Sequence, residues 1–119
     1  MYMGKYTIVL YVKENGESPI RKFIDSLDIK MKAKALRMIN LLKQNGNELR
    51  EPYTKSLSDG LLELRIIQSN HIVRILFFFV HGNTIVLTNG FIKKSNKTPK
   101  REIELAQNYR RDYFDRIGE

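Results

Sequence analysis

Residues Gly90–Arg101 read GFIKKSNKTPKR and join the most apolar part of the chain to a long amphipathic segment. The stretch holds five cations and no carboxylate. Like charges repel one another, so such a run is unfavourable unless an anion offsets it, and phosphate is the obvious candidate. A solvated basic loop is the alternative. Because a strand is expected to lead into the run and a helix to follow it, its backbone should be held in place, which favours an anion site.

Composition indicates one globular domain over residues 1–119. The hydrophobic share is 42%, which is ordinary for a folded protein. The absence of cysteine excludes disulfides and thiolate metal sites and fits the reducing cytoplasm. Membrane insertion is not expected, because no apolar run nears the roughly 18 residues that a span requires. The net charge of +8 points instead to an acidic partner: nucleic acid, an anionic surface or an acidic protein.

A strand and two helices are expected in the N-terminal half. Residues 6–12 (YTIVLYV) are β-branched and aromatic, which is typical of a strand. Ser18 can cap a helix and Pro19 suits its first position. Apolar residues at helical spacing continue this helix to about residue 27. Asp28 can then cap a second helix.

The second helix is predicted to end at Gly46 and carries a basic face. Residues 30–43 contain five cations and no carboxylate. Lys30, Lys34 and Arg37 share one side of the helix, at i, i+4 and i+7. This side is either a solvated face or a second surface that follows phosphates.

Three strands are expected after a polar connection over residues 49–58. Residues 62–66 (LELRI) alternate, so their charged and apolar side chains should lie on opposite faces. Residues 72–80 (IVRILFFFV) are apolar on both faces, which is typical of a central strand. Residues 84–88 (TIVLT) form the last predicted strand.

Arg74 is the most informative residue of the predicted central strand. Burying a guanidinium without a partner costs much free energy, so it must find one. Glu63 on the neighbouring strand is a candidate for a structural ion pair. An anion-binding role is the alternative.

The order of elements predicts an α+β fold. The final helix is expected from Pro99 to about Arg116, with Thr98 as its cap. The resulting β-α-α-β-β-β-α order implies a curved four-stranded, mainly antiparallel sheet, because its last three strands are joined by short connections. The first strand should pair in parallel through a crossover. The helical hairpin covers one face, and the last helix lies on the other face or at the edge.

Several motifs together resemble a known family. They are Ser18-Pro19…Phe23, Pro52…Lys55-x-Leu57, Gly60-Leu61-Leu62-Glu63-Leu64-Arg65, Val73-Arg74-Ile75-Leu76-Phe77 and Gly90-Phe91-Ile92-Lys93-Lys94…Lys97-Thr98-Pro99…Glu102-Ile103-Glu104-x-Ala106. This pattern is similar to the phage-derived Gp49-like and HigB-like toxins of the RelE/ParE superfamily. The resemblance implies that fold, and a type II toxin with a cognate antitoxin protein as partner. It also implies ribosome-dependent cleavage of mRNA, with the ribosome and mRNA as further partners.

RNA cleavage without a metal makes three chemical demands. A group must accept the proton of the 2′-OH, cations must offset the phosphorane charge, and a group must protonate the leaving 5′-oxygen. Related toxins often have histidine where this chain has Asn89, and tyrosine where it has Val73. The two histidines, His71 and His81, are both predicted near turns. These departures favour a lysine as the group that transfers protons, because neighbouring cations lower the pKa of a lysine. The alternative is catalysis mostly by positioning and charge stabilisation.

These considerations assign roles to specific cations, with no cofactor and no metal. Arg65 and Arg74 are expected to hold the scissile phosphate, and Lys94, or failing that Lys93, to transfer protons. Further RNA contacts are assigned to one aromatic residue and seven cations: Phe91, Lys55, Lys97, Lys100, Arg101, Lys30, Lys34 and Arg37. For Phe91, burial at the end of a strand is the alternative to stacking on a base.

Two other functions share this fold and charge. A poison of DNA gyrase, as in the ParE branch, would cause DNA breaks without cleaving RNA. A catalytically inactive relative would bind RNA in a salt-dependent way without turnover.

Overall fold

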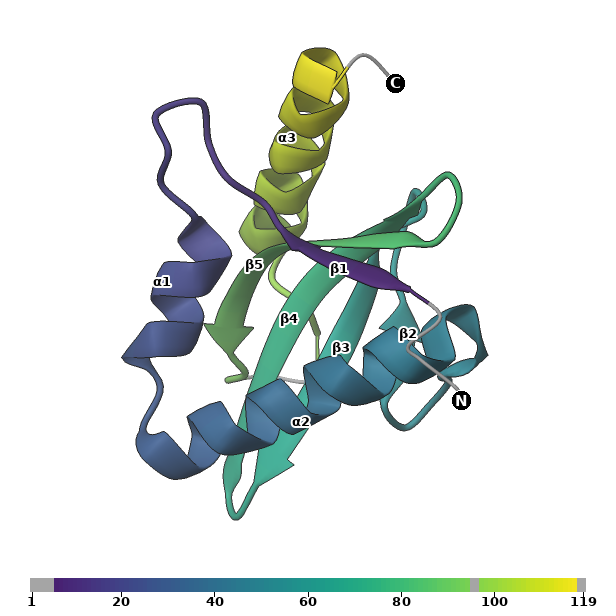
Figure 1. The fold of residues 1–119 in the computed structure, drawn as a ribbon. Helices are drawn as coiled ribbons and strands as arrows, with labels where there is room; N and C mark the ends of the chain where they lie inside the picture. Colours follow the sequence, from purple (N-terminus) through teal and green to yellow (C-terminus); the bar gives the residue numbers. More distant parts are fainter. Residues whose placement is uncertain (1–5, 95–96, 118–119) are drawn as a thin grey trace.

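The computed structural model describes residues 6–94 and 97–117, and Figure 1 shows a curved sheet with helices on both sides. Ser95 and Asn96 of the basic run lie outside the described residues. The strands are β1 (Thr7–Leu10), β2 (Thr54–Ser56), β3 (Leu62–Gln68), β4 (His71–Val80) and β5 (Thr84–Ile92). The helices are α1 (Pro19–Ser26), α2 (Ile29–Asn45), the 3₁₀ turn η1 (Gly46–Glu48) and α3 (Lys100–Ile117).

The sheet has the order β1-β5-β4-β3-β2 and confirms the predicted α+β class. β1 pairs with β5 in parallel, whereas every other neighbouring pair is antiparallel. The predicted count of four strands was wrong, because Thr54–Ser56 forms a fifth, edge strand against β3. Three polar residues carry no hydrophobic alternation, so only their backbone pairing reveals this strand.

The helical hairpin covers one face of the sheet as expected. The Ser18 hydroxyl accepts a hydrogen bond from the Arg21 amide, and the Asp28 carboxylate accepts one from the Met31 amide. The hairpin buries Ile20, Met31, Ala35 and Leu42 against the inward side chains of β3, β4 and β5. Gly46 ends α2 with a φ of 54°, a conformation that glycine adopts without strain.

The C-terminal helix α3 lies on the face of the sheet opposite the helical hairpin. The sequence had left open whether it lies on that face or at the edge. Ala106 of α3 packs into a second core with Leu76 and Phe78. Near the other end of α3, the Tyr11 hydroxyl donates a 2.5 Å hydrogen bond to the Asp112 carboxylate. Burial, together with this hydrogen bond, raises the pKa of Tyr11 to about 12.

The start of α3 differs from the prediction. The helix begins at Lys100, and the carbonyl of Pro99 accepts hydrogen bonds from the amides of Glu102 and Ile103. The Thr98 hydroxyl does not act as the predicted cap but donates to the carboxylate of Glu63. A charged, buried acceptor is the stronger partner for a hydroxyl, which explains the difference.

A β-bulge in β5 decides which side chains reach the α3 face. Phe77 pairs with Leu87, but Leu76 pairs with Asn89, so Thr88 is an extra residue. Odd-numbered residues before the bulge face the hairpin, and those after it face α3. The bulge thereby directs Asn89 and Phe91 to the α3 side.

Candidate functional site

The α3 face of the sheet presents two neighbouring rows of side chains across its strands. In one row, Lys55 pairs with Glu63. In the next row, Arg65 pairs with Arg74, and Arg74 pairs with Phe91. Two arginines directly opposite each other repel, so this arrangement is unfavourable for the fold alone. Their placement makes an anion-binding role worth testing.

Glu63 is the carboxylate of this region and is already engaged. It is fully buried and forms an ion pair with Arg74, which confirms the predicted partner. Its second oxygen accepts the hydrogen bond from Thr98. Glu63 therefore fixes Arg74 from one side and ties the end of the basic run to the sheet from the other.

Arg74 itself is a poor candidate for direct contact with RNA. Its side chain is only 3% exposed, and one guanidinium nitrogen is bound to Glu63. Its Nε has no hydrogen-bond partner among the described residues. The charge of Arg74 consequently acts on the site through space.

Arg65 is the accessible arginine of the pair. Its side chain is half-buried, and its buried Nε has no partner within the part of the chain that the structure describes. The backbone amide of Arg65 donates a 2.8 Å hydrogen bond to the carbonyl of Tyr53, which holds the strand in place beneath the guanidinium. A positioned guanidinium without a carboxylate partner is suited to bind a phosphate.

Lys93 completes the group. Its amide donates a 2.8 Å hydrogen bond to the carbonyl of Ile72, so the chain still follows β4 beyond the end of β5. Desolvation, followed by the charges of Arg74 and Arg65, lowers the pKa of the Lys93 ammonium. Lys55 adds to this effect, and Glu63 opposes it. We call Lys55, Arg65, Arg74 and Lys93 the sheet cluster.

The other cations of the basic run lie outside the sheet cluster. Lys94 follows Lys93 on the opposite side of the backbone and lines a pocket with Phe23 and Phe91. Lys97 and Lys100 are exposed, and Arg101 lines the same pocket as Lys94.

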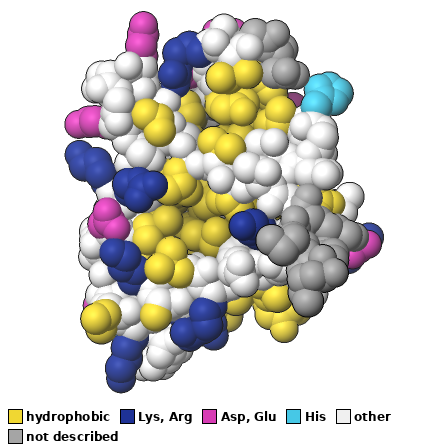
Figure 2. All heavy atoms as spheres, in the orientation of Figure 1, with side chains coloured by type: hydrophobic (Ala, Val, Ile, Leu, Met, Phe, Trp, Pro, Cys, Tyr) yellow, Lys and Arg dark blue, Asp and Glu magenta, His cyan; other side chains and the backbone are white. Residues whose placement is uncertain are grey.

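The basic face of α2 lies on the other side of the sheet. Lys30 and Arg37 are exposed, and Lys34 is partly exposed. The buried side of α2 packs in the core between the helical hairpin and the sheet, which we call the hairpin core. Figure 2 shows the hairpin side of the molecule, where Lys and Arg side chains lie around apolar ones over its lower part. The structure therefore does not bring these three cations together with the sheet cluster.

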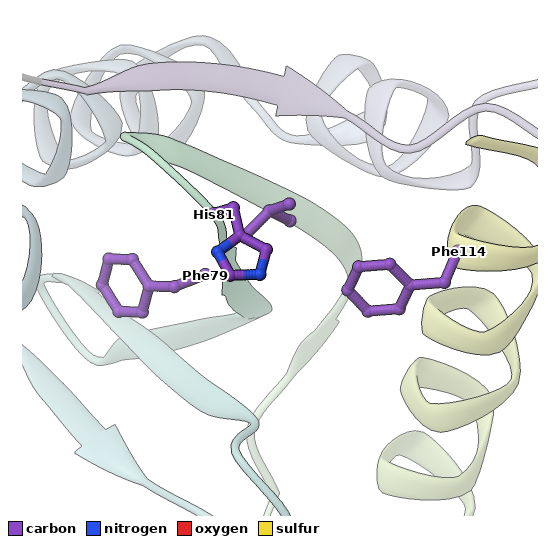
Figure 3. Close-up of a pocket in the computed structure, with 4 residues that line it drawn as sticks. Phe79, His81 and Phe114 are labelled. Atoms are coloured by element: carbon purple, nitrogen blue, oxygen red, sulfur yellow. The ribbon is translucent and has the colours of Figure 1, made fainter. Parts of the chain in front are cut away.

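Neither histidine joins the sheet cluster. His71 lines a small pocket beside Val73 and Met31, on the hairpin side. His81 follows β4 at its far end, seven residues and thus about 23 Å along the strand from Arg74. Figure 3 shows the His81 ring between Phe79 and Phe114, in a pocket of about 380 Å³.

Asn89 and Val73 both have structural roles here. The Asn89 amide group is buried and donates to the Glu102 carboxylate at 3.0 Å and to its carbonyl at 3.2 Å. This contact ties α3 to β5. Val73 is buried in the hairpin core and faces away from the sheet cluster.

The family model "Phage derived protein Gp49-like (DUF891)" matches residues 22–111, which is most of the chain. The chain belongs to this Gp49-like family. No curated protein matches it. The family is phage-derived and toxin-like.

The Gp49-like match spans all the sheet-cluster residues and the first part of α3. Among the described residues, no three His, Asp or Glu side chains gather closely enough to hold a metal ion. No helix within residues 6–94 and 97–117 is long and apolar enough to cross a membrane.

Sequence reasoning missed two residues beside the sheet cluster. Thr98 was interpreted as a helix cap, although it contacts Glu63. Tyr53 immediately precedes β2, its carbonyl accepts the hydrogen bond from the Arg65 amide, and 46% of it is exposed. The x-Tyr-x-Lys spacing would have revealed Tyr53 only if β2 had been recognised as a strand.

Proposed function

We propose that this Gp49-like protein is the toxin of a type II toxin–antitoxin system and cleaves mRNA on the ribosome without a metal. The observation that carries the proposal is the sheet cluster, where four cations meet one carboxylate that is already bound. Such a site is suited to a phosphate whose negative charge increases in the transition state.

The proposed reaction uses the RNA's own 2′-OH. Its oxygen attacks the adjacent phosphorus, the bond to the 5′-oxygen of the next nucleotide breaks, and a cyclic phosphate and a free 5′-hydroxyl result. One proton leaves the 2′-OH and one reaches the 5′-oxygen. Arg65 contacts the phosphate, and Lys55 and Lys97 hold its neighbours.

Lys93 is the proposed proton-transfer residue. The sequence favoured Lys94, but Lys93 is the lysine of the basic run that belongs to the sheet cluster. The lowered pKa of Lys93 increases the neutral fraction that accepts a proton. Arg74, held by Glu63, is a positioning residue that keeps positive charge behind the phosphate and lowers the pKa of Lys93.

A cleavage assay on programmed ribosomes with a defined mRNA tests this function. Arg65→Ala should lose about 10²–10³-fold in rate through lost charge stabilisation. Lys93→Ala should lose about 10²–10⁴-fold through lost proton transfer, and more than Lys94→Ala. Lys22→Ala, an exposed α1 lysine near Glu17, is the matched control and should cleave normally.

Two results would contradict the proposal. Unchanged cleavage by both Arg65→Ala and Lys93→Ala would remove the site. Absence of any cut by the folded wild-type protein would remove the nuclease function, and DNA supercoiling would then be assayed for inhibition of gyrase.

The cognate antitoxin is the proposed protein partner, and α2 offers it a surface. Ile29 is 84% exposed and Leu36 is 51% exposed, and with Ala33 they form one stripe at i, i+4 and i+7. α2 contains five cations and no carboxylate. An acidic amphipathic segment complements both features. We therefore infer that the antitoxin covers this stripe.

A further inference from the structure

A pocket lies at the open edge of β5, next to the sheet cluster. β1 pairs with β5 over Thr84–Leu87, and within the described residues no strand pairs with Asn89–Ile92 on that side. The pocket has a volume of about 310 Å³, at the low end of the range for ligand sites. Its lining residues are Phe23, Phe91, Ile92, Lys94, Pro99, Arg101 and Glu102.

Aromatic side chains line this edge pocket from both faces of β5. Phe23 comes from α1 and packs so closely on Gly90 that a Cβ atom there would lie 2.5 Å from its ring. Phe91 comes from the α3 face, where it pairs with Arg74. Aromatic rings are suited to bases, because every base has a π-face that can stack.

The polar groups of the edge pocket combine two cations with one carboxylate. Lys94 and Arg101 are exposed and suited to a phosphate. The Glu102 Oε1 atom accepts the hydrogen bond from Asn89, which fixes the carboxylate. Its Oε2 atom is 3.8 Å from the Arg101 Nε, so it retains capacity to accept hydrogen bonds.

A fixed carboxylate discriminates among the bases. Guanine presents two adjacent N–H donors on one edge, which match a carboxylate acceptor. Uracil presents one N–H between two carbonyl oxygens, and these oxygens would face the negative charge. Discrimination thus combines an attraction with a repulsion.

We propose that the edge pocket binds a nucleobase, with guanine preferred over the other bases. This inference rests on the proposed function, because it assigns a place to the base of a nucleotide next to the phosphate at Arg65. Phe91 joins the two sites, since it lines the pocket and pairs with Arg74 across the strands.

The test is a titration of the ¹⁵N-labelled full chain with each of the four ribonucleoside 5′-monophosphates, followed by NMR at one salt concentration. GMP should shift the amide signals around Phe91 and Glu102 and bind about tenfold more tightly than UMP. Glu102→Gln should abolish that preference, because an amide offers one acceptor instead of two. Phe91→Leu should weaken the binding of all four nucleotides.

Phe114→Leu is the matched control. It alters the other aromatic pocket (Figure 3), which the carboxylate and cations of the edge pocket do not line, and should leave GMP binding unchanged. Equal affinities for all four nucleotides, or a preference unaffected by Glu102→Gln, would overturn the inference. So would shifts confined to α2 or to the Phe114 pocket.

The failure of this inference is distinguishable from failure of the proposed function. Arg65→Ala should slow cleavage by about 10²–10³-fold, as expected above, and keep the preference for GMP over UMP. If the wild-type protein prefers GMP but does not cleave RNA, the base-binding pocket is supported and the nuclease function is contradicted. If cleavage depends on Arg65 but the four nucleotides bind equally well, the nuclease function is supported and the base-binding pocket is contradicted.

Discussion

The two groups of cations in this protein lie on opposite sides of one sheet. In the sheet cluster, three cations on strands and Lys93, just beyond the end of β5, crowd together, and the carboxylate of Glu63 beside them is buried and engaged. Along α2, five cations are spread over a helix around the exposed side chains of Ile29 and Leu36. Crowded cations lower the pKa of a neighbouring ammonium group, as at Lys93, whereas cations spread along a helix form a positively charged surface. The count of charges is similar, but their placement separates a candidate active site from a candidate docking face.

The largest expected effect concerns the buried ion pair of the sheet cluster. Glu63→Gln leaves the Arg74 charge buried and unpaired and should lower the free energy of unfolding by about 3–5 kcal/mol. Asp25→Asn breaks the exposed pair with Lys32 on the hairpin side and should cost about 0–1 kcal/mol. Urea unfolding followed by circular dichroism measures both. Similar losses for the two variants would show that the sheet cluster is as well hydrated as the hairpin surface.

The next effect concerns the surface along α2. Replacing Ile29 and Leu36 by serine should weaken antitoxin binding by roughly 10–100-fold, because two exposed apolar anchors are lost. Cleavage by the free toxin should stay at the wild-type rate. Calorimetry with the purified antitoxin gives the affinity, and Val12→Ser, another exposed apolar position, is the control. Undiminished affinity would move the antitoxin to the α3 side.

A smaller effect separates the two groups by salt dependence. The affinity for a non-cleavable RNA oligonucleotide should fall with salt, and Arg65→Gln should reduce the logarithmic slope by about 0.7, the value for one phosphate contact on a single strand. Lys34→Gln should leave the slope unchanged, because α2 lies on the opposite face of the sheet from Arg65. An equal reduction by Lys34→Gln would support the RNA contact that the sequence predicts for Lys30, Lys34 and Arg37.

The smallest effect is on the pH dependence of stability. The folded state lowers the pKa of Lys93 below its usual 10.5, so between the two values the unfolded chain binds more protons and stability rises with pH. Lys93→Met removes this contribution. The variant should be more stable than wild type at neutral pH, and the difference should shrink as the pH approaches 10.5. Thermal unfolding between pH 7 and 10.5 measures it, and a constant difference would show that Lys93 is not crowded.

Much of the fold was predictable from local patterns. Ser18 and Asp28 cap the helices that they were predicted to cap, and the Leu-Glu-Leu-Arg alternation of β3 separated Glu63 from the leucines correctly. β2 was missed because its three residues have no hydrophobic period. Thr98 was misinterpreted because a cap signal depends on neighbours in sequence, whereas its partner, Glu63, is 35 residues away.

Patterns in the sequence were enough to predict the helices, the central strands and the excess of positive charge, and they offered Glu63 as one of two explanations for a buried Arg74. These follow from periodicity, capping and the cost of burying a lone charge, which are local or nearly local effects. Tertiary structure alone decided which lysine faces the sheet cluster. The extra residue at Thr88 switches the side to which alternate residues of β5 point, so Lys93 joins Arg65 while Lys94 turns to the edge pocket. The register between β4 and β5 depends on packing against both cores at once. Two adjacent lysines are chemically identical, so the sequence does not show which of them this register turns toward Arg65.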